Sequence, residues 1–427
     1  MHHDTVITII KNNMKPALGV TEPAAIALAS AKAYENVRGK IQSIKVTVDP
    51  GVFKNSFCCA IPGTSEFGNE TAAILGVLAG DPGLKLEVLK HISKEHAADA
   101  AALRRSGIVS VKVKKGLSEV YIDAVITTDR GVGRAVIENC HDNIVLVEKN
   151  GETVFRKESK GGESTDPDRT FLNDFSVTDF RQFADEVPFK DIRFILDAVR
   201  MNRILAESGM SGRGMGTGAA LSMLMKNGIL SDDLRSYAEM LTACAVDARM
   251  GGVPKPAMSI AGSGDHGIIA TLPLLAVKEK INASEEKLAR AIALSYLVTI
   301  YIKNHSGLLS AFCGCAVAAG TGASAGIVYL LGGNTGQIGY AIDNMAANIT
   351  GMVCDGGNYG CALKAITGAG AAVTSALFAM NDVVIPSGSG ITGLSVEETM
   401  KNMGRIAAPG MIRTDEEILS IMEERIY

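Results

Sequence analysis

Residues Gly307–Gly333, GLLSAFCGCAVAAGTGASAGIVYLLGG, decide the class of fold. No charged residue occurs from Ser306 to Ile342, and this run is longer than the ~20 apolar residues that a membrane-spanning helix needs. Most of its residues are Gly, Ala, Ser and Thr, whose small side chains let helices approach one another closely. The run therefore predicts buried Gly/Ala-rich helices inside a large helical domain rather than a membrane span.

A second uncharged run, Ala365–Met380, has the same character, and the surrounding sequence has a helical period with no strand pattern. Further helices are predicted at Asp174–Asp185, Phe189–Glu207, Gly218–Asn227, Asp232–Asp247, Gly267–Lys280, Ser284–Ile302, Ser395–Gly404 and Asp415–Arg425. Residues 166–427 are therefore predicted to form an all-helical domain.

The first part of the chain mixes two periods. Helical patterns cover Ala24–Tyr34, Glu70–Gly80 and Ser93–Ser106, and strand patterns cover Ile41–Val48, Val109–Val113, Val120–Thr128 and Val132–Asn139. Asn150-Gly151 separates two further strand patterns and predicts a hairpin turn. Lys157–Arg169 is polar and rich in Gly and Ser, which is typical of a linker. Residues 1–165 are therefore predicted to form a smaller α+β domain.

The composition excludes several classes of partner. The 427 residues carry a net charge of −4 and no Trp, so neither nucleic acid nor an anionic membrane is expected to bind. Residues 1–16 lack the apolar core of a signal peptide, and a cytoplasmic location is expected. The eight cysteines are then expected to be reduced, metal-bound or catalytic rather than disulfide-bonded.

Four of these cysteines could share a site. Cys354 and Cys361 flank a glycine-rich loop, and Cys313 and Cys315 precede them by some forty residues. On a helix, residues i and i+2 point about 200° apart, so only one of Cys313 and Cys315 is expected to face the other two thiols. Three thiolates suit a [4Fe–4S] cluster with one open iron. The alternative is that all four are buried as small apolar side chains.

Two glycine-rich stretches offer binding groups. In AGSGDHG, Ala261–Gly267, Ser263 and nearby backbone N–H groups could hold a carboxylate, and His266 could act as acid or base; an ordinary helix cap is the alternative. In SGMSGRGMGTG, Ser208–Gly218, Arg213 suggests an anion-binding loop, and a flexible connector is equally consistent with the sequence.

The chain as a whole resembles the L-cysteine desulfidase family, which is distantly related to iron–sulfur L-serine dehydratases. The resemblance covers nearly the whole chain. It rests on the motifs PALGVTEPAAIALA, NSFCCAIPGT, VPFKDIRFILDAVRMN, DARMGG, GSGDHGI, LARAIALSYLVTIYIKN and TGMVCDGGNYGCALK, which occur in this order.

This resemblance implies a lyase that needs no pyridoxal phosphate and eliminates the β-substituent of a small amino acid. L-cysteine would give pyruvate, ammonia and sulfide, and an L-serine dehydratase-type reaction is the alternative. The implied ligands of a [4Fe–4S] cluster are Cys313, Cys354 and Cys361, with Cys315 as the alternative to Cys313. A homodimer is also expected.

One motif departs from the family pattern. The family has Gly-Cys-Thr-Glu-Pro, whose Cys is the proposed proton acceptor, and this chain has Val20 at that place. Valine cannot accept a proton, so His266 becomes the expected base, with Thr21 and Glu22 beside the site. The alternative is a non-catalytic relative that binds a metal or an amino acid. The residues expected to bind substrate are Asn55, Ser211, Arg213, Ser263, Gly264, Asp265 and Asn358.

Overall fold

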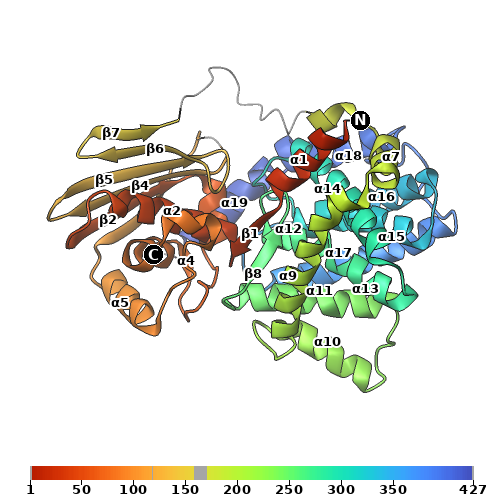
Figure 1. Cartoon of the computed structure of the whole chain (residues 1–427), viewed down its shortest axis with the longest axis horizontal. Coiled ribbons are helices and arrows are strands. Elements are labelled where there is room, and N and C mark those ends of the chain that lie inside the picture. Colours follow the sequence, from red (N-terminus) through yellow and green to blue (C-terminus); the bar gives the residue numbers. More distant parts are fainter. Residues whose placement is uncertain (1, 118, 158–170, 426–427) are drawn as a thin grey trace.

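The computed structural model describes residues 2–117, 119–157 and 171–425. It has a mixed α+β fold in two lobes (Figure 1). We call residues 15–157 the sheet region and residues 171–411 the helical region. The predicted boundary at residue 165 and nearly all of the predicted linker lie outside the described residues.

The sheet region contains a six-stranded sheet in the order β3-β2-β4-β5-β6-β7. Its strands are β2 (Ile41–Val48), β3 (Val109–Val113), β4 (Tyr121–Thr128), β5 (Gly131–Glu138), β6 (Ile144–Lys149) and β7 (Glu152–Arg156). Neighbouring strands are antiparallel except for β2 and β3. The predicted hairpin joins β6 to β7, with positive φ at both Asn150 and Gly151, as such a turn requires.

Helices cover the sheet and surround its apolar core. They are α2 (Thr21–Glu35), α3 (Pro50–Ser56), α4 (Gly68–Ala79), α5 (Lys94–Arg105) and the 3-10 helix η1 (Pro82–Glu87). α2 packs on β4 and β5 and is covered in turn by α4. Its alanines are therefore buried on nearly every side, which explains why it has no clear polar face.

The helical region surrounds a larger core. Its α-helices are α7 (Val177–Glu186), α8 (Phe189–Ile192), α9 (Leu196–Gly209), α10 (Thr217–Lys226), α11 (Leu234–Met250), α12 (Gly264–Ile269), α13 (Leu272–Ile281), α14 (Glu285–Ser306), α15 (Gly320–Leu331), α16 (Thr335–Ile349), α17 (Cys361–Met380) and α18 (Val396–Arg405). Short 3-10 helices are η2 (Leu172–Asp174) and η3 (Arg193–Ile195), and π-helical turns are η4 (Cys315–Ala319) and η5 (Ile406–Gly410).

The uncharged stretch Gly307–Gly333 contains η4 and α15, which lie at the centre of this region. α15 is buried from Gly320 to Leu330 and packs along α14. A Cβ atom at Gly322 would lie 2.3 Å from the carbonyl oxygen of Ser295 in α14. Glycine at this position therefore lets the two helices approach more closely than any larger residue would allow.

The prediction of a C-terminal part without strands is wrong at one place. β8 (Pro256–Ser259) pairs antiparallel with β1 (Lys15–Leu18) in a two-stranded sheet. Four residues are too few to show a period, and the strand exists only because a distant segment supplies its partner. This small sheet connects the two regions directly ahead of the Ala261–Gly267 motif.

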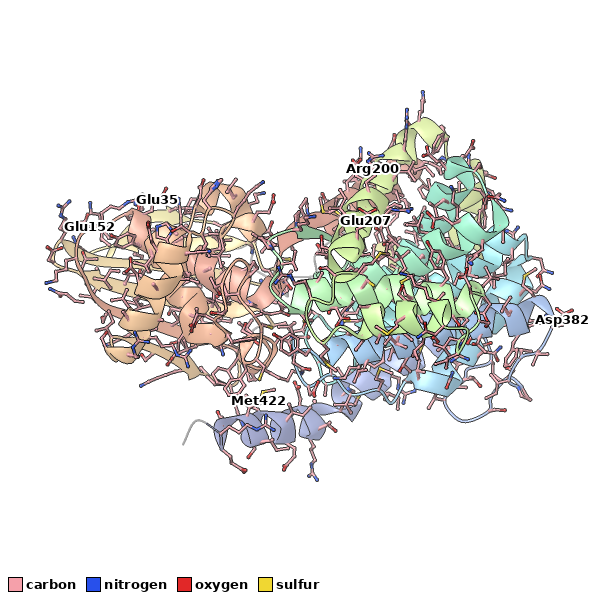
Figure 2. All side chains as sticks on the ribbon, turned by 90° about the horizontal axis from the view of Figure 1, so that it is seen from below. Glu35, Glu152, Arg200, Glu207, Asp382 and Met422 are labelled. Atoms are coloured by element: carbon pink, nitrogen blue, oxygen red, sulfur yellow. The ribbon has the colours of Figure 1, made fainter. Side chains whose placement is uncertain are left out.

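The predicted division assigns the N-terminal helix to the α+β domain and the C-terminal helix to the helical domain. In the structure each of these two helices packs on the other lobe. Val6, Ile9 and Ile10 of α1 (His3–Asn13) belong to the core of the helical region. α19 (Ile412–Glu423) extends beneath the sheet region, where Met422 marks it (Figure 2), and its Leu419 joins the core of that region. The lobes are thus connected at both ends of the chain.

One described helix, α17, is long and apolar enough by length and composition to cross a membrane. Half of its most apolar window is buried inside the protein. A core helix of a folded protein passes the same test, so this feature is weak evidence for a membrane span.

Candidate functional site

A cavity lies where the sheet region meets the helical region. Its volume is about 60 Å³, and one buried water needs about 10–15 Å³ on this measure, so a few waters or one small molecule would fill it. The sheet region contributes Glu22, Asn55 and His141 to its wall. The helical region contributes, among others, Ser263, His266, Lys303, Ser310, Cys315 and Cys354.

Glu22 is fixed in the wall by its neighbours from the sheet region. It lies in the first turn of α2, where a carboxylate is favoured by the positive end of the helix dipole. Asn55 Nδ2 donates to its Oε1 and Thr21 Oγ1 donates to its Oε2, both over 2.9 Å. The structure thus brings together the three residues that the sequence singled out in this part of the chain.

His141 joins this group and was not identified from the sequence. It lies in the turn between β5 and β6, is 5% exposed, and places Nε2 3.6 Å from Oε1 of Glu22. Its local sequence, NCHDN, carries no motif. The only available signal was a histidine in a short polar turn between two strands, because loops at the ends of strands often carry functional residues.

These contacts determine the charge of Glu22. Burial alone would raise the pKa of its carboxyl, but the neighbouring ring of His141 opposes this, as do the hydrogen bonds from Asn55 and Thr21. Together they lower its pKa to about 2. Glu22 is therefore a carboxylate at any physiological pH, although its side chain is buried.

His266, the base expected from the sequence, has a different environment. Its Nδ1 lies 3.2 Å and 3.3 Å from the carbonyl oxygens of Ile260 and Ala261, so Nδ1 carries the proton and donates it. Burial and the positive charge of Lys303 lower the pKa of His266 to about 3. Its ring is therefore neutral, and a Cβ atom at Gly314 would lie only 2.5 Å from its Nε2.

Lys303 supplies a positive charge in the same wall. It lies near the end of α14, is 4% exposed and donates from Nζ to the carbonyl oxygen of Leu308 over 3.2 Å. Ser310, also in the wall, has a buried hydroxyl with no hydrogen-bond partner among the described residues. A cation and an unsatisfied hydroxyl in the same cavity wall suit the carboxylate of a small molecule.

Asp265, predicted to bind substrate, is instead paired inside the protein. Its Oδ1 lies 2.8 Å from Nη1 of Arg249, and both side chains are almost fully buried. Arg249 Nε also donates to the carbonyl oxygen of Gly19 over 3.1 Å, and its guanidinium packs on the backbone of Gly264. This ion pair fixes the loop that carries Ser263 and His266 against the start of α2.

Two cysteine-bearing loops lie side by side. Phe312 and Val353 form an antiparallel bridge. Cys313 N donates to the carbonyl oxygen of Met352 over 3.0 Å, and Cys354 N donates to that of Ala311 over 2.6 Å. Loops some forty residues apart in sequence therefore carry Cys313 and Cys354 to the same place.

The prediction that Cys313 and Cys315 diverge is wrong, because the chain there is not a regular α-helix. Cys313 precedes the π-helical turn η4, and its sulfur is in hydrogen-bonding contact with that of Cys315. The Cys315 thiol and the N–H of Ala316 outweigh burial and lower the pKa of Cys313 to about 7. Cys313 is thus the thiol most ready to ionise, and the thiolate is the form that binds a metal.

Cys361 completes the group at the first residue of α17, within electrostatic reach of Cys313 and Cys354. Asn358, predicted to bind substrate, instead organises the loop before it, because its Oδ1 accepts from Gly360 N over 2.8 Å and its Nδ2 donates to the carbonyl oxygen of Gly356 over 3.1 Å. Within the described ranges, no three His, Cys, Asp or Glu side chains converge closely enough to hold a single metal ion. An iron–sulfur cluster binds each thiolate at a different iron, so its ligands need not meet at one point.

Val20, where the family pattern has cysteine, is buried beside another thiol. Cys59 Sγ donates to the carbonyl oxygens of Asn55 and Gly357, over 2.7 Å and 3.2 Å. Gly357 lies in the loop between Cys354 and Cys361 and approaches both Val20 and Cys59. Burial holds the pKa of Cys59 well above its usual value, so this thiol stays protonated and ties the cysteine loop to the sheet region.

The other predicted anion site lies away from the cavity. Ser211 and Arg213 are both exposed, and neither lines its wall. Their loop leads into α10, where the buried carboxylate of Asp247 accepts hydrogen bonds from Thr217 Oγ1 and Gly218 N over 2.7 Å and 2.9 Å. In this structure the loop therefore connects two helices.

Comparison with known proteins reveals similarity to one enzyme family over most of the chain. The family model for the serine dehydratase alpha chain matches residues 83–420. A UPF0597 protein of Clostridium botulinum (strain Hall) is 50% identical over 429 residues, covering 99% of both chains. UPF0597 proteins of Clostridioides difficile and Caldanaerobacter subterraneus subsp. tengcongensis are 41% and 40% identical over 420 and 415 residues, covering 97% of this chain and 98% and 97% of their own.

These matches support only the broader part of the resemblance to L-cysteine desulfidases and iron–sulfur L-serine dehydratases. They place the chain among serine dehydratase-like proteins, the wider group to which the resemblance pointed. They do not single out the L-cysteine desulfidases.

Proposed function

The chain belongs to the serine dehydratase alpha chain family, and from that premise we propose that it is an iron–sulfur-dependent lyase that removes the β-substituent of a small L-amino acid. The observation that carries the proposal is the cavity wall, where a paired carboxylate and histidine face a group of thiols. L-cysteine is the first candidate substrate because of the motif resemblance. L-serine is the second because of the family.

The cysteines fit a [4Fe–4S] cluster. Cys313, Cys354 and Cys361 would hold it, since their sulfurs lie within electrostatic reach of one another and one of them ionises near neutral pH. Cys315 and Cys354 line the cavity, so a substrate bound there would lie directly against these cysteines. When bound, the cluster would supply a Lewis acid that stabilises negative charge on the leaving group.

The other wall residues would bind and orient the amino acid. Lys303 and Ser310, which line the same cavity, would receive the carboxylate. The unpaired Oδ1 of Asn55, next to the Glu22 carboxylate, would receive the ammonium group. The small volume of the cavity would exclude long side chains, which limits the substrate to amino acids of the size of serine or cysteine.

Anaerobic purification and iron–sulfur reconstitution test the proposal. We expect a brown protein with broad visible absorbance that contains iron and acid-labile sulfide and forms pyruvate and ammonia from one of the two amino acids. Sulfide release from L-cysteine would assign the desulfidase reaction, and pyruvate from L-serine alone would assign the dehydratase reaction. A colourless protein after anaerobic reconstitution would contradict iron–sulfur dependence.

Val20 in place of cysteine favours one alternative, a relative that binds an amino acid without converting it. Such a protein would hold the cluster and change its absorbance on adding L-serine or L-cysteine, yet form no pyruvate. Turnover of either amino acid by the reconstituted protein excludes this alternative.

A further inference from the structure

We propose that His141, held by Glu22, is the group that removes the Cα proton from the substrate, in place of the His266 expected from the sequence. This inference rests on the proposed β-elimination and adds to it a catalytic residue that no sequence motif identifies. It follows from the different surroundings of the two histidines of the cavity.

His141 has the geometry of a base with an orienting carboxylate. Its Nε2 faces Oε1 of Glu22 at 3.6 Å and has no other acceptor among the described residues. Since Nε2 is directed at Glu22, Nδ1 is the nitrogen that remains for a substrate. Nδ1 lies on the side of Gly262, which lines the same cavity.

Glu22 serves as the positioning residue. Hydrogen bonds from Thr21 and Asn55 fix both of its oxygens, and its carboxylate stays ionised in spite of burial. A fixed negative charge beside an imidazole stabilises the imidazolium that forms when the ring takes a proton, as the buried aspartate does in serine protease triads. Thr21 and Asn55 thus act on His141 through Glu22.

The other charged groups around His141 leave this assignment unchanged. The carboxylate of Asp49 is not available to orient His141, because it accepts hydrogen bonds from three backbone N–H groups. These belong to Gly51, Val52 and Tyr121, over 2.8, 3.1 and 2.7 Å. Lys303 lines the same cavity, and its positive charge acts on His266.

His266 lacks a carboxylate partner of this kind. Its Nδ1 proton is committed to two carbonyl oxygens, and the nearby carboxylate of Asp265 is paired with Arg249. An imidazolium at His266 would be buried beside the cation Lys303 without compensation. His266 therefore suits a neutral hydrogen-bonding role toward the substrate rather than proton removal.

The step balances with the groups at hand. Nδ1 of His141 takes the proton from Cα, and the C–H electron pair forms the Cα–Cβ double bond. The Cβ–S or Cβ–O bond breaks, and the leaving atom keeps its electron pair and departs as hydrosulfide or hydroxide. One water then hydrolyses the released aminoacrylate to pyruvate and ammonia, and the imidazolium returns its proton to solvent or to the leaving group.

The test compares His141→Gln with His266→Gln and with His91→Gln, an exposed histidine outside the cavity, all in the reconstituted protein. We expect His141→Gln to lower kcat by about 10²–10⁴-fold with iron content, visible absorbance and KM little changed. His266→Gln is expected to lower kcat by less than one tenth of that loss, and His91→Gln to leave it unchanged. Glu22→Gln should lower kcat with KM retained, and Glu22→Asp should restore part of the loss.

Chemical rescue separates a base from a structural role. His141→Gly leaves space for a small base, so added imidazole should restore turnover in a saturable manner. A His141→Gln protein that keeps kcat within about threefold of wild type, or a folded His141→Gly protein with full cluster content that imidazole does not rescue, overturns the assignment of the base alone. A wild-type protein that holds the cluster but converts neither amino acid overturns the proposed function, and the base assignment with it.

Discussion

The sheet region and the helical region bring different chemistry to the same cavity. The sheet region supplies the carboxylate of Glu22, fixed by hydrogen bonds from Thr21 and Asn55, with the ring of His141 beside it. The helical region supplies thiols, the neutral His266 and the cation Lys303. In the proposed reaction, proton transfer would come from one region and cluster binding from the other, so the site would be complete only where the two regions meet.

The largest effect is expected from removing a thiol of the helical region. Cys361→Ala should lose the cluster, because only two of its three proposed ligands, Cys313 and Cys354, remain, and lyase activity should fall to background. The measurement is iron and sulfide per chain with visible absorbance. Cys244→Ala is the matched control, since that thiol is also buried in the helical region but lies against Met240 and Gly218, and it should keep full iron content.

The contact between the regions should break when Lys54 is replaced. Lys54 is 1% exposed, pairs with Asp415 of α19, and donates to the carbonyl oxygens of Ser310 and Cys354 over 3.1 Å and 3.3 Å. Lys54→Met should lower the free energy of unfolding by about 2–4 kcal/mol, because it leaves these acceptors unpaired at the junction.

Chemical denaturation of the metal-free protein measures this change. Lys90→Met is the control, since Lys90 is about half exposed and pairs with Glu87, and it should cost less than about 1 kcal/mol. An equal effect of the two substitutions would show that α19 does not clamp the regions together.

The cation of the cavity should affect substrate binding more than the exposed cation of the glycine-rich loop. Lys303→Met is expected to raise KM by about 10–100-fold, the value of one charged hydrogen bond, while iron content is retained. Arg213→Ala should change KM by less than about twofold, because its side chain is exposed and outside the wall. A larger rise in KM for Arg213→Ala than for Lys303→Met would indicate that the loop Ser208–Gly218 binds the substrate carboxylate.

The smallest effect concerns pH and the neutral histidine. Burial and Lys303 lower the pKa of His266 from 6.5 to about 3, so between these values the unfolded chain binds a proton that the folded chain does not. Above pH 6.5 His266 is neutral in both states and has no effect on the free energy of unfolding. As pH falls from 6.5 toward 3 it disfavours folding by about 1.4 kcal/mol per pH unit.

Urea unfolding of the metal-free protein between pH 7 and pH 5 checks this dependence. His266→Gln should flatten the decline in stability, and His91→Gln, at an exposed position, should not. An unchanged slope in His266→Gln would mean that this ring accepts a proton in the folded protein.

Local pattern predicted most of the secondary structure. The alternation of Ile122, Ala124 and Ile126 marks β4, and Asn150-Gly151 marks the hairpin, because both signals depend only on neighbours in sequence. β8 gave no such signal, since its strand depends on pairing with β1. The sequence predicted a helix at Asp415–Arg425, which overlaps α19, and none at α1. It could not assign either helix to a core, because a sequence period shows that a face is apolar but not which core that face joins.

The sequence by itself determined the chemical inventory of this protein: the thiols, the uncharged helices that bury them, and the carboxylate of Glu22 at a helix start. Tertiary structure alone decided how these groups are used. The bridge between Phe312 and Val353 brings Cys313 to Cys354, and the turn between β5 and β6 carries His141 to Glu22. The physical reason is that proton transfer and metal binding act over a few ångströms, and contacts between segments more than a hundred residues apart, such as Glu22 and His141, are set by the packing of the whole chain.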